Sequence, residues 1–173
     1  MAKHLTEKIV ALLGGLLGLR FGKEIIVFLI SMMPVLELRG GLIAASLLRL
    51  PPWKSYIICI IGNLIPIPLI LWLIKSVLHR MEKSSVSFFK AFAKWLHQKV
   101  QKNKKGIETY GFWGLVFFVG IPLPGTGAWT GSMIAAVLDM DRKKTFFAVL
   151  LGVFFASIIM MLISFGLLAR FLH

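Results

Sequence analysis

Glu37 and Arg39 have the side chains best suited to chemistry, because both lie in the middle of an apolar stretch. They are the only ionisable residues at predicted mid-membrane depth, where a charge costs about 2.5–3.5 kcal/mol on insertion scales and marks a functional candidate. Desolvation favours a neutral carboxyl group, so Glu37 could bind and release a proton. The planar guanidinium of Arg39 could hold a phosphate or a carboxylate. Alternatively, the two residues form a structural ion pair, or Arg39 reaches out to the membrane surface.

Polar residues in other apolar segments could complete a site for a substrate or a proton. The candidates, which could donate hydrogen bonds or form a stacking wall, are Asn63, Thr126, Trp129 and Thr130. Free backbone N–H groups at helix starts near Gly40 and Gly127 would favour an anion. Small hydroxyl residues also serve helix packing in membranes, so packing remains an alternative for the threonines and for Trp129.

The composition places these residues in an integral membrane protein. Hydrophobic residues make up 58% of 173 residues, and the mean hydropathy is +0.85. A soluble domain of this size has too little interior for so much apolar surface. The net charge of +13 indicates positive-inside loops and contact with anionic lipid head groups rather than nucleic acid.

Metal, cofactor and enzyme signatures are not found in the sequence. Cys59 is the single cysteine, and the four histidines are scattered without a ligand partner, so neither a disulfide framework nor a metal site is predicted. Hydrolase, metalloprotease and phosphate-loop motifs are also missing. We therefore expect no cofactor and no enzymatic activity.

Two apolar segments are interrupted by glycine and proline, at 24–50 and 112–140. Each arm is about half of the roughly 20 residues that a membrane crossing needs. Irregular backbone at membrane depth must be packed in protein or line a cavity. Each segment therefore predicts a re-entrant helical hairpin, with a first turn from Pro34 to Gly41. The residues expected to shape the two loops are Pro34, Gly40, Gly41, Pro122, Pro124, Gly125 and Gly127.

Two further segments, 55–77 and 145–171, are long and apolar enough to span a membrane. The first contains Gly62, Asn63, Pro66 and Pro68 and predicts a kinked helix. The run at 9–19 predicts a short helix that is interfacial or partly inserted, within an N-terminal segment 1–23.

The linker at 79–111 is basic, and its aromatic residues recur at helical spacing within it. This pattern predicts an amphipathic helix on the membrane surface, beginning at one of the serines at 84, 85 and 87. Lys90, Lys94 and Lys102 could contact lipid head groups, each contributing about 1 kcal/mol near an anionic surface. A solvated connector is the alternative.

The two interrupted segments belong to a repeat, because Gly41-Leu-Ile-Ala-Ala is echoed by Gly131-Ser-Met-Ile-Ala-Ala, and Gly62 by Gly152. A hairpin that returns to its starting face, followed by one crossing, makes the second repeat inverted. The predicted fold is an all-α integral membrane protein with two inverted repeats, each a re-entrant helical hairpin followed by a transmembrane helix. A basic amphipathic interfacial helix joins them. The single membrane domain, 1–173, divides into the N-terminal helix at 1–23, repeat 1 at 24–78, the linker at 79–111 and repeat 2 at 112–173.

The motifs MPVLELRGGLIAA and GIPLPGTGAWTGSMIAA, with a Gly-Asn span and a basic linker between them, resemble the family named putative small multidrug export proteins. More distantly the chain resembles the DedA (VTT-domain) superfamily. That resemblance implies two opposed re-entrant hairpins and proton-dependent transport or flipping of lipid phosphates such as undecaprenyl phosphate. Glu37 and Arg39 match the charged first hairpin of that superfamily. Pro124-Gly125 departs from it, since Leu, Thr, Ala and Trp stand where DedA proteins carry arginines.

The sequence leaves two hypotheses for function. The first is a transporter or flippase of an amphiphilic small molecule or a lipid-phosphate carrier, proton-coupled through Glu37, with Arg39 binding the anionic group. The alternative is a non-transporting membrane scaffold or lipid-binding protein that acts through its basic amphipathic helix. Partners would be membrane lipids, a polyprenyl phosphate or an amphiphilic drug, with no nucleic acid. The protein is expected in the cell membrane, with the linker on the cytoplasmic face by the positive-inside rule. A chain with so few membrane crossings could hardly enclose a pathway alone, so we also expect a homo-oligomer, specifically a dimer.

Overall fold

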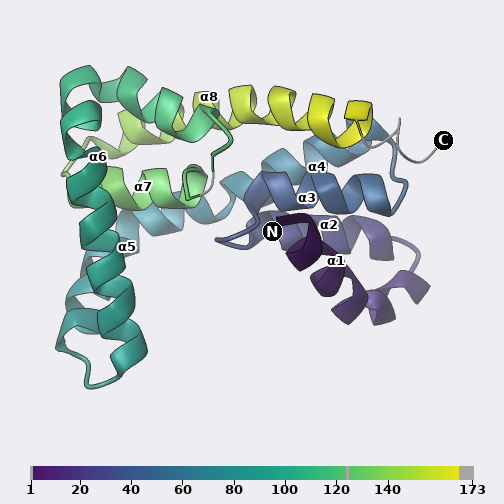
Figure 1. The fold of residues 1–173 in the computed structure, drawn as a ribbon, viewed down its shortest axis with the longest axis horizontal. Helices are drawn as coiled ribbons and strands as arrows, with labels where there is room; N and C mark the ends of the chain where they lie inside the picture. Colours follow the sequence, from purple (N-terminus) through teal and green to yellow (C-terminus); the bar gives the residue numbers. More distant parts are fainter. Residues whose placement is uncertain (1, 124, 168–173) are drawn as a thin grey trace.

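The computed structural model describes residues 2–123 and 125–167, which contain helices and no strand (Figure 1). The all-α fold predicted from the sequence is therefore confirmed over this range. The helices are α1 (Ala2–Leu12), α2 (Gly22–Met32), α3 (Glu37–Leu47), α4 (Pro52–Leu64), α5 (Pro66–Lys83), α6 (Ser87–Gly120), α7 (Ala128–Val137) and α8 (Arg142–Met161), with a 3-10 turn at Gly14–Gly18 and a π-helical end at Leu162–Leu167.

Two helical stretches are long and apolar enough to cross a membrane, namely Pro52–Lys83 and Arg142–Gly166. They contain most of both predicted spans, although the first continues to Lys83. It is interrupted at Ile65, between α4 and α5, where Pro66 has no N–H to donate to the helix. In Figure 1, α4 and α5 follow one another toward α6, whereas α8 runs the other way.

The first interrupted segment forms α2 and α3, which pack against each other and against α4. The chain reverses at residues 33–36, which we call the first tip. This turn is shorter than predicted, because Gly40 and Gly41 lie inside α3. A Cβ on Gly41 would overlap Ser31 Oγ and lie 2.8 Å from Cys59 Sγ. The loop-shaping role predicted for these two glycines is thus corrected: both lie inside α3, where Gly41 packs closely against α2 and α4 and Gly40 packs against the side chain of Leu36, just before α3.

The second interrupted segment begins inside the long helix α6. Gly111 has a φ of +52° and divides α6 into a basic part, 87–110, and an apolar part, 112–120. The basic part begins at Ser87, one of the predicted serines, and in Figure 1 it runs across the direction of α8. After Gly120 comes the second tip, residues 121–127, and then α7.

The N-terminal helix lies earlier in the chain than predicted. A helix was expected at 9–19, but α1 covers Ala2–Leu12 and a 3-10 turn follows at Gly14–Gly18. Gly14 and Gly15 explain the end of α1, since glycine lowers helix stability by about 1 kcal/mol. α1 packs on α3 and has Thr6 fully buried.

The same packing contacts occur in both halves of the chain. A Cβ on Gly62 would lie 2.9 Å from Phe28 O and 3.0 Å from Ser31 Cβ. A Cβ on Gly152 would lie 2.9 Å from Val116 O and 2.7 Å from Val119 Cβ. Ser31 and Val119 are also the residues that Gly41 and Gly131, respectively, approach most closely. In each half, glycines at matching positions therefore bring two helices against one neighbour, which is α2 in the first half and α6 in the second.

The ends of α3 and α7 match as well. Arg49 and Asp139 follow these helices with φ values of +54° and +59°. The next residues close the same hydrogen bond, from Leu50 N to Ala45 O and from Met140 N to Ala135 O, each 3.0 Å long. The sequence echo between the two halves thus extends to backbone geometry.

Replacing Gly152 with Ala should destabilise the packing of α8 on α6. The added methyl group has no room beside Val119 and Val116, and overpacking of this kind costs about 1–3 kcal/mol. Gly106→Ala is the matched control, because Gly106 lies in α6 with nothing within 4 Å of its Cβ position. That change should add about 0.5–1 kcal/mol of stability. Thermal unfolding in detergent measures both, and equal melting temperatures would contradict this account of α6 and α8.

Candidate functional site

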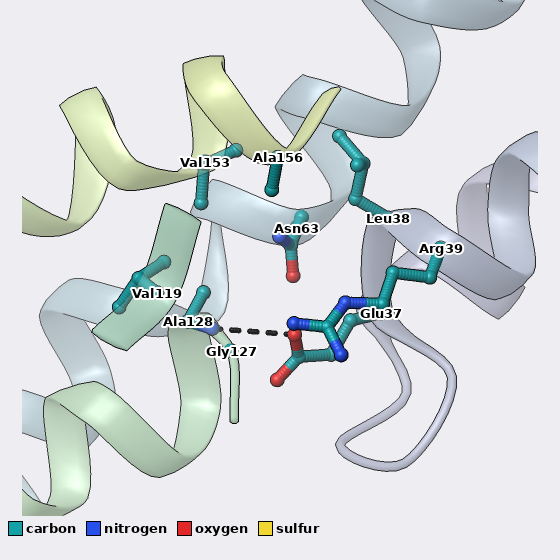
Figure 2. A pocket seen from close by; sticks show the side chains of 9 residues that line it. All are labelled: Glu37, Leu38, Arg39, Asn63, Val119, Gly127, Ala128, Val153 and Ala156. Carbon is teal, nitrogen blue, oxygen red and sulfur yellow. Dashed lines mark hydrogen bonds between the residues drawn. The ribbon is translucent and has the colours of Figure 1, made fainter. Parts of the chain in front are cut away.

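The carboxylate of Glu37 binds the start of α7. Glu37 opens α3 with a φ of +50° and is 5% exposed. Its side chain accepts hydrogen bonds from the backbone N–H groups of Ala128 (3.2 Å) and Trp129 (3.0 Å), and the first of these is drawn in Figure 2. A helix N-terminus carries partial positive charge and unpaired N–H groups, which an anion stabilises. Glu37 therefore caps a helix that belongs to the other half of the chain.

Arg39 binds the second tip at the end of α6. Its guanidinium donates to Leu123 O (2.5 Å), Ile121 O (3.4 Å) and Thr126 Oγ1 (3.2 Å). The Thr126 hydroxyl lies 3.0 Å from Ile121 O and 2.9 Å from Leu123 O, so the loop folds around it. Carbonyl groups beyond a helix C-terminus carry partial negative charge, which suits a cation.

Glu37 and Arg39 thus serve opposite ends of the break between α6 and α7. In residues 2–123 and 125–167 no ion pair joins the two side chains, although Figure 2 shows the guanidinium beside the carboxylate. The sequence left open a structural ion pair between Glu37 and Arg39. The described residues do not form that pair. Both charges instead join the start of α3, just after the first tip, to the second half: Arg39 to the second tip and Glu37 to the start of α7.

Gly127 leaves the space that Glu37 occupies. Its φ is +139°, and a Cβ there would overlap the Glu37 carboxylate. Counting back from the matched pair Gly41 and Gly131, Glu37 and Gly127 are at equivalent positions in the two halves. Equivalent residues therefore face each other, and there is room for the side chain of only one.

A small cavity lies beside the Glu37 carboxylate. Its volume is about 10 Å³, which is about enough for one water molecule. Asn63, 2% exposed on α4, lines it, and Figure 2 shows the amide oxygen pointing toward Glu37 and Arg39. The Oδ1 atom of Asn63 has no hydrogen-bond partner among the described residues. The remaining wall includes the apolar side chains of Val119, Val153 and Ala156. A buried acceptor is thus available beside the carboxylate.

The other predicted residues lie around these contacts in different ways. Trp129 offers its backbone N–H to Glu37, while its indole Nε1 is buried without a partner in the described chain. Thr130 is 6% exposed inside α7. Gly125, with a φ of +79°, lies in the second tip, where only glycine adopts such a φ at no cost. Pro34 and Pro122 lie in the first and second tips, respectively, and Pro124 lies outside the described residues.

Lys90, Lys94 and Lys102 are exposed on the basic part of α6 and do not reach either tip. Lys99, which the sequence did not single out, does reach one. Its ammonium lies 3.4 Å from Gly125 O and 5.9 Å from the centre of the Trp95 ring. Only the fold distinguishes Lys99 from the other lysines of this helix. Within the described ranges no group of three or more His, Cys, Asp or Glu side chains could hold a metal ion.

These features define a membrane protein, helical over its described residues, in which two breaks between helices meet around the buried Glu37 and the partly exposed Arg39. The chain belongs to the small multi-drug export family: a family model described as "Putative small multi-drug export protein" matches residues 37–159. The matched range includes Glu37, Arg39, Asn63 and the second tip, and its description is that of an export protein rather than an enzyme. No curated protein matches the chain, and no solved structure matches it.

Proposed function

We propose that the protein is a proton-coupled membrane transporter whose two tips form the gate, with Glu37 as the proton carrier. The observation that carries this proposal is the pair of contacts across the tips, in which Glu37 binds the start of α7 and Arg39 binds the loop before it. Discontinuous helices that meet inside a membrane protein are a common place for substrate and ion sites. The export description of the family supports the same class.

Protonation of Glu37 would weaken the contact between the tips. Hydrogen bonds to a charged carboxylate are about twice as strong as neutral ones, so the cap on α7 loses strength when the charge is neutralised. The new hydroxyl needs an acceptor, and Asn63 Oδ1 is a buried acceptor beside the cavity. Asn63 therefore favours the protonated form, in which the tips separate more easily.

Arg39 would bind the anionic group of the substrate when the tips separate. Its present acceptors are a hydroxyl and neutral carbonyl groups, and a phosphate or carboxylate is a stronger partner for guanidinium. The substrate class is an amphiphilic small molecule or a lipid-phosphate carrier, because the tips lie among apolar helices. Thr126, Trp129 and Thr130 would line its path.

The architecture that suits this mechanism is an inverted repeat in one membrane domain, 1–173. Each half would be a re-entrant hairpin followed by a span, and the matching glycine contacts support this arrangement. The basic part of α6 would lie on the cytoplasmic face of the cell membrane, and the protein would act as a homodimer. Alternating access would then rock one half against the other about the tips.

Arg39→Ala should lower the flux of an amphiphilic anionic dye, driven by a pH gradient in proteoliposomes, by at least about 10-fold. That factor corresponds to the loss of one charge-assisted hydrogen bond of about 1.5–3 kcal/mol. Arg39→Lys should retain part of the flux, because lysine keeps the charge without the planar fork. The control is Arg80→Ala, since Arg80 is exposed on α5 away from the tips. Normal flux in Arg39→Ala, or no gradient-dependent flux in the wild type, contradicts the proposal.

A scaffold or lipid-binding function is the second candidate, favoured by the exposed Lys90, Lys94 and Lys102 next to the exposed Phe88. It predicts that changing these three lysines to Gln removes membrane-linked activity while Arg39 variants behave normally. The opposite pattern supports the transporter.

A further inference from the structure

We propose that an anionic phospholipid binds in an apolar groove between α4, α6 and α8, with its head group at Lys143 and Lys144. The groove has a volume of about 530 Å³. Its lining is Ile60, Phe112, Phe147, Leu150, Leu151 and Phe154. None of these residues lines the cavity beside Glu37, so the groove is separate from the proposed transport site.

The groove ends at a basic cluster. Lys143 precedes Phe147 by four positions on α8, and Lys144 precedes Leu151 by seven, so both lysines lie on the groove face of the helix. Both are exposed, and neither forms an ion pair within the described part of the chain. The nearby carboxylates are engaged: Asp141 accepts from the backbone N–H of Lys144, and Asp139 pairs with Lys75. The side chains of Lys143 and Lys144 are therefore left without an anion.

The position of these lysines on α8 also favours an anion. They lie in the first turn of a helix, where the partial positive charge of the N-terminus disfavours further cations. Asp141 already caps this terminus, so a phosphate group here would offset the charges of the two lysines. The exposed basic residues therefore favour an anionic head group.

The dimensions suit a membrane lipid. The candidate span begins at Arg142, which puts Lys143 and Lys144 at the depth of the head groups. At about 1.5 Å per residue, Phe154 lies about 16 Å further along α8. Half of the hydrocarbon core of a bilayer is about 15 Å thick. One acyl chain with its head group at the lysines would therefore extend along the groove to the middle of the membrane.

A second copy of the chain is a poorer occupant than a lipid. A two-fold interface brings the same residues of both copies together. Across this groove it would place two basic clusters at the same depth, and like charges held together are destabilising. An anionic lipid fills the apolar surface and supplies the missing charge.

The test is native mass spectrometry of the full chain in mild detergent, with phosphatidylglycerol and phosphatidylcholine of identical acyl chains added separately. We expect phosphatidylglycerol to bind at least about 10-fold more tightly. The double variant Lys143→Gln/Lys144→Gln should lose roughly 30-fold in affinity for it, which is about 1 kcal/mol for each basic residue. The control Lys3→Gln/Lys8→Gln makes the same charge change at exposed positions of α1 and should bind as the wild type does.

Leu151→Trp provides an independent test, because the larger side chain fills the groove without changing the charge. It should weaken binding of phosphatidylglycerol while the protein keeps its oligomeric mass. Equal binding of the two lipids, or unchanged affinity in the Lys143/Lys144 double variant, would overturn the proposal. A change of oligomeric mass in Leu151→Trp would also overturn it, since the groove would then be covered by a second copy.

Discussion

Glu37→Gln should reduce transport driven by a pH gradient to the background of empty liposomes while the protein still folds. Glutamine has the shape of glutamate, but it cannot carry the coupling proton. In glutamine one of the two carboxylate oxygens is replaced by an NH2 group, which donates and does not accept, so one of the two N–H groups that Glu37 now binds would face another donor. The donor left buried without a partner costs about 1–3 kcal/mol. Flux in proteoliposomes and thermal unfolding in detergent measure the two effects separately.

Glu24→Gln is the matched control for this change. Glu24 lies in the first turn of α2 and pairs with Lys54 at 2.5 Å, away from both tips. A surface pair of this kind contributes about 0–1 kcal/mol, so this variant should transport and unfold as the wild type does. Transport by Glu37→Gln with the wild-type dependence on the pH gradient would exclude Glu37 as the proton carrier.

Gly127→Ala should be among the most destabilising single substitutions in the chain. The new Cβ would overlap the Glu37 carboxylate, so the carboxylate must leave the N–H groups of Ala128 and Trp129. Each buried donor left unpaired costs about 1–3 kcal/mol, and backbone strain at a φ of +139° adds about 1–3 kcal/mol. The two donors and the strain together should cost about 3–9 kcal/mol in thermal unfolding, with transport lost as well.

Gly125→Ala is the control for backbone strain alone. Gly125 also has a positive φ, but the nearest atom to its Cβ position is the flexible Nζ of Lys99, at 2.7 Å. We expect a loss of about 1–2 kcal/mol. A double-mutant cycle supplies a second check, because Gly127→Ala should cost little more than strain once Glu37→Ala has removed the carboxylate. Additive costs for Gly127→Ala and Glu37→Ala would show that the two positions do not interact.

The sequence predicted the helices and the breaks between them well, because apolar runs and proline positions reflect local physics. It was less successful where packing overrides local preference. Gly40 and Gly41 suggested a loop, yet both lie inside α3, where Gly41 is in close contact with α2 and α4. Likewise the polar residues 79–83 continue α5 as helix, because this end of α5 packs against the basic part of α6.

The candidate site was predictable in its members but not in its pairings. Glu37 and Arg39 stand out in any hydropathy reading, whereas their main partners are backbone groups of Ala128, Trp129 and Leu123. Backbone partners cannot be recognised from a sequence, because nearly every residue supplies the same N–H and C=O groups. Gly127 is the exception, because a glycine at the position equivalent to Glu37 makes room for that side chain.

The facing pair of Glu37 and Gly127 also limits the number of protons that one transport cycle can carry, and therefore the net charge that the cycle moves. Two equivalent halves would ordinarily offer two equivalent carboxyl positions, but here the second is a glycine whose missing side chain accommodates the first. Under the proposed function, a cycle can therefore carry one proton at most through this pair. One proton moving with a singly charged anion transfers no net charge, so a chemical gradient of protons would drive such a cycle and a membrane voltage alone would not.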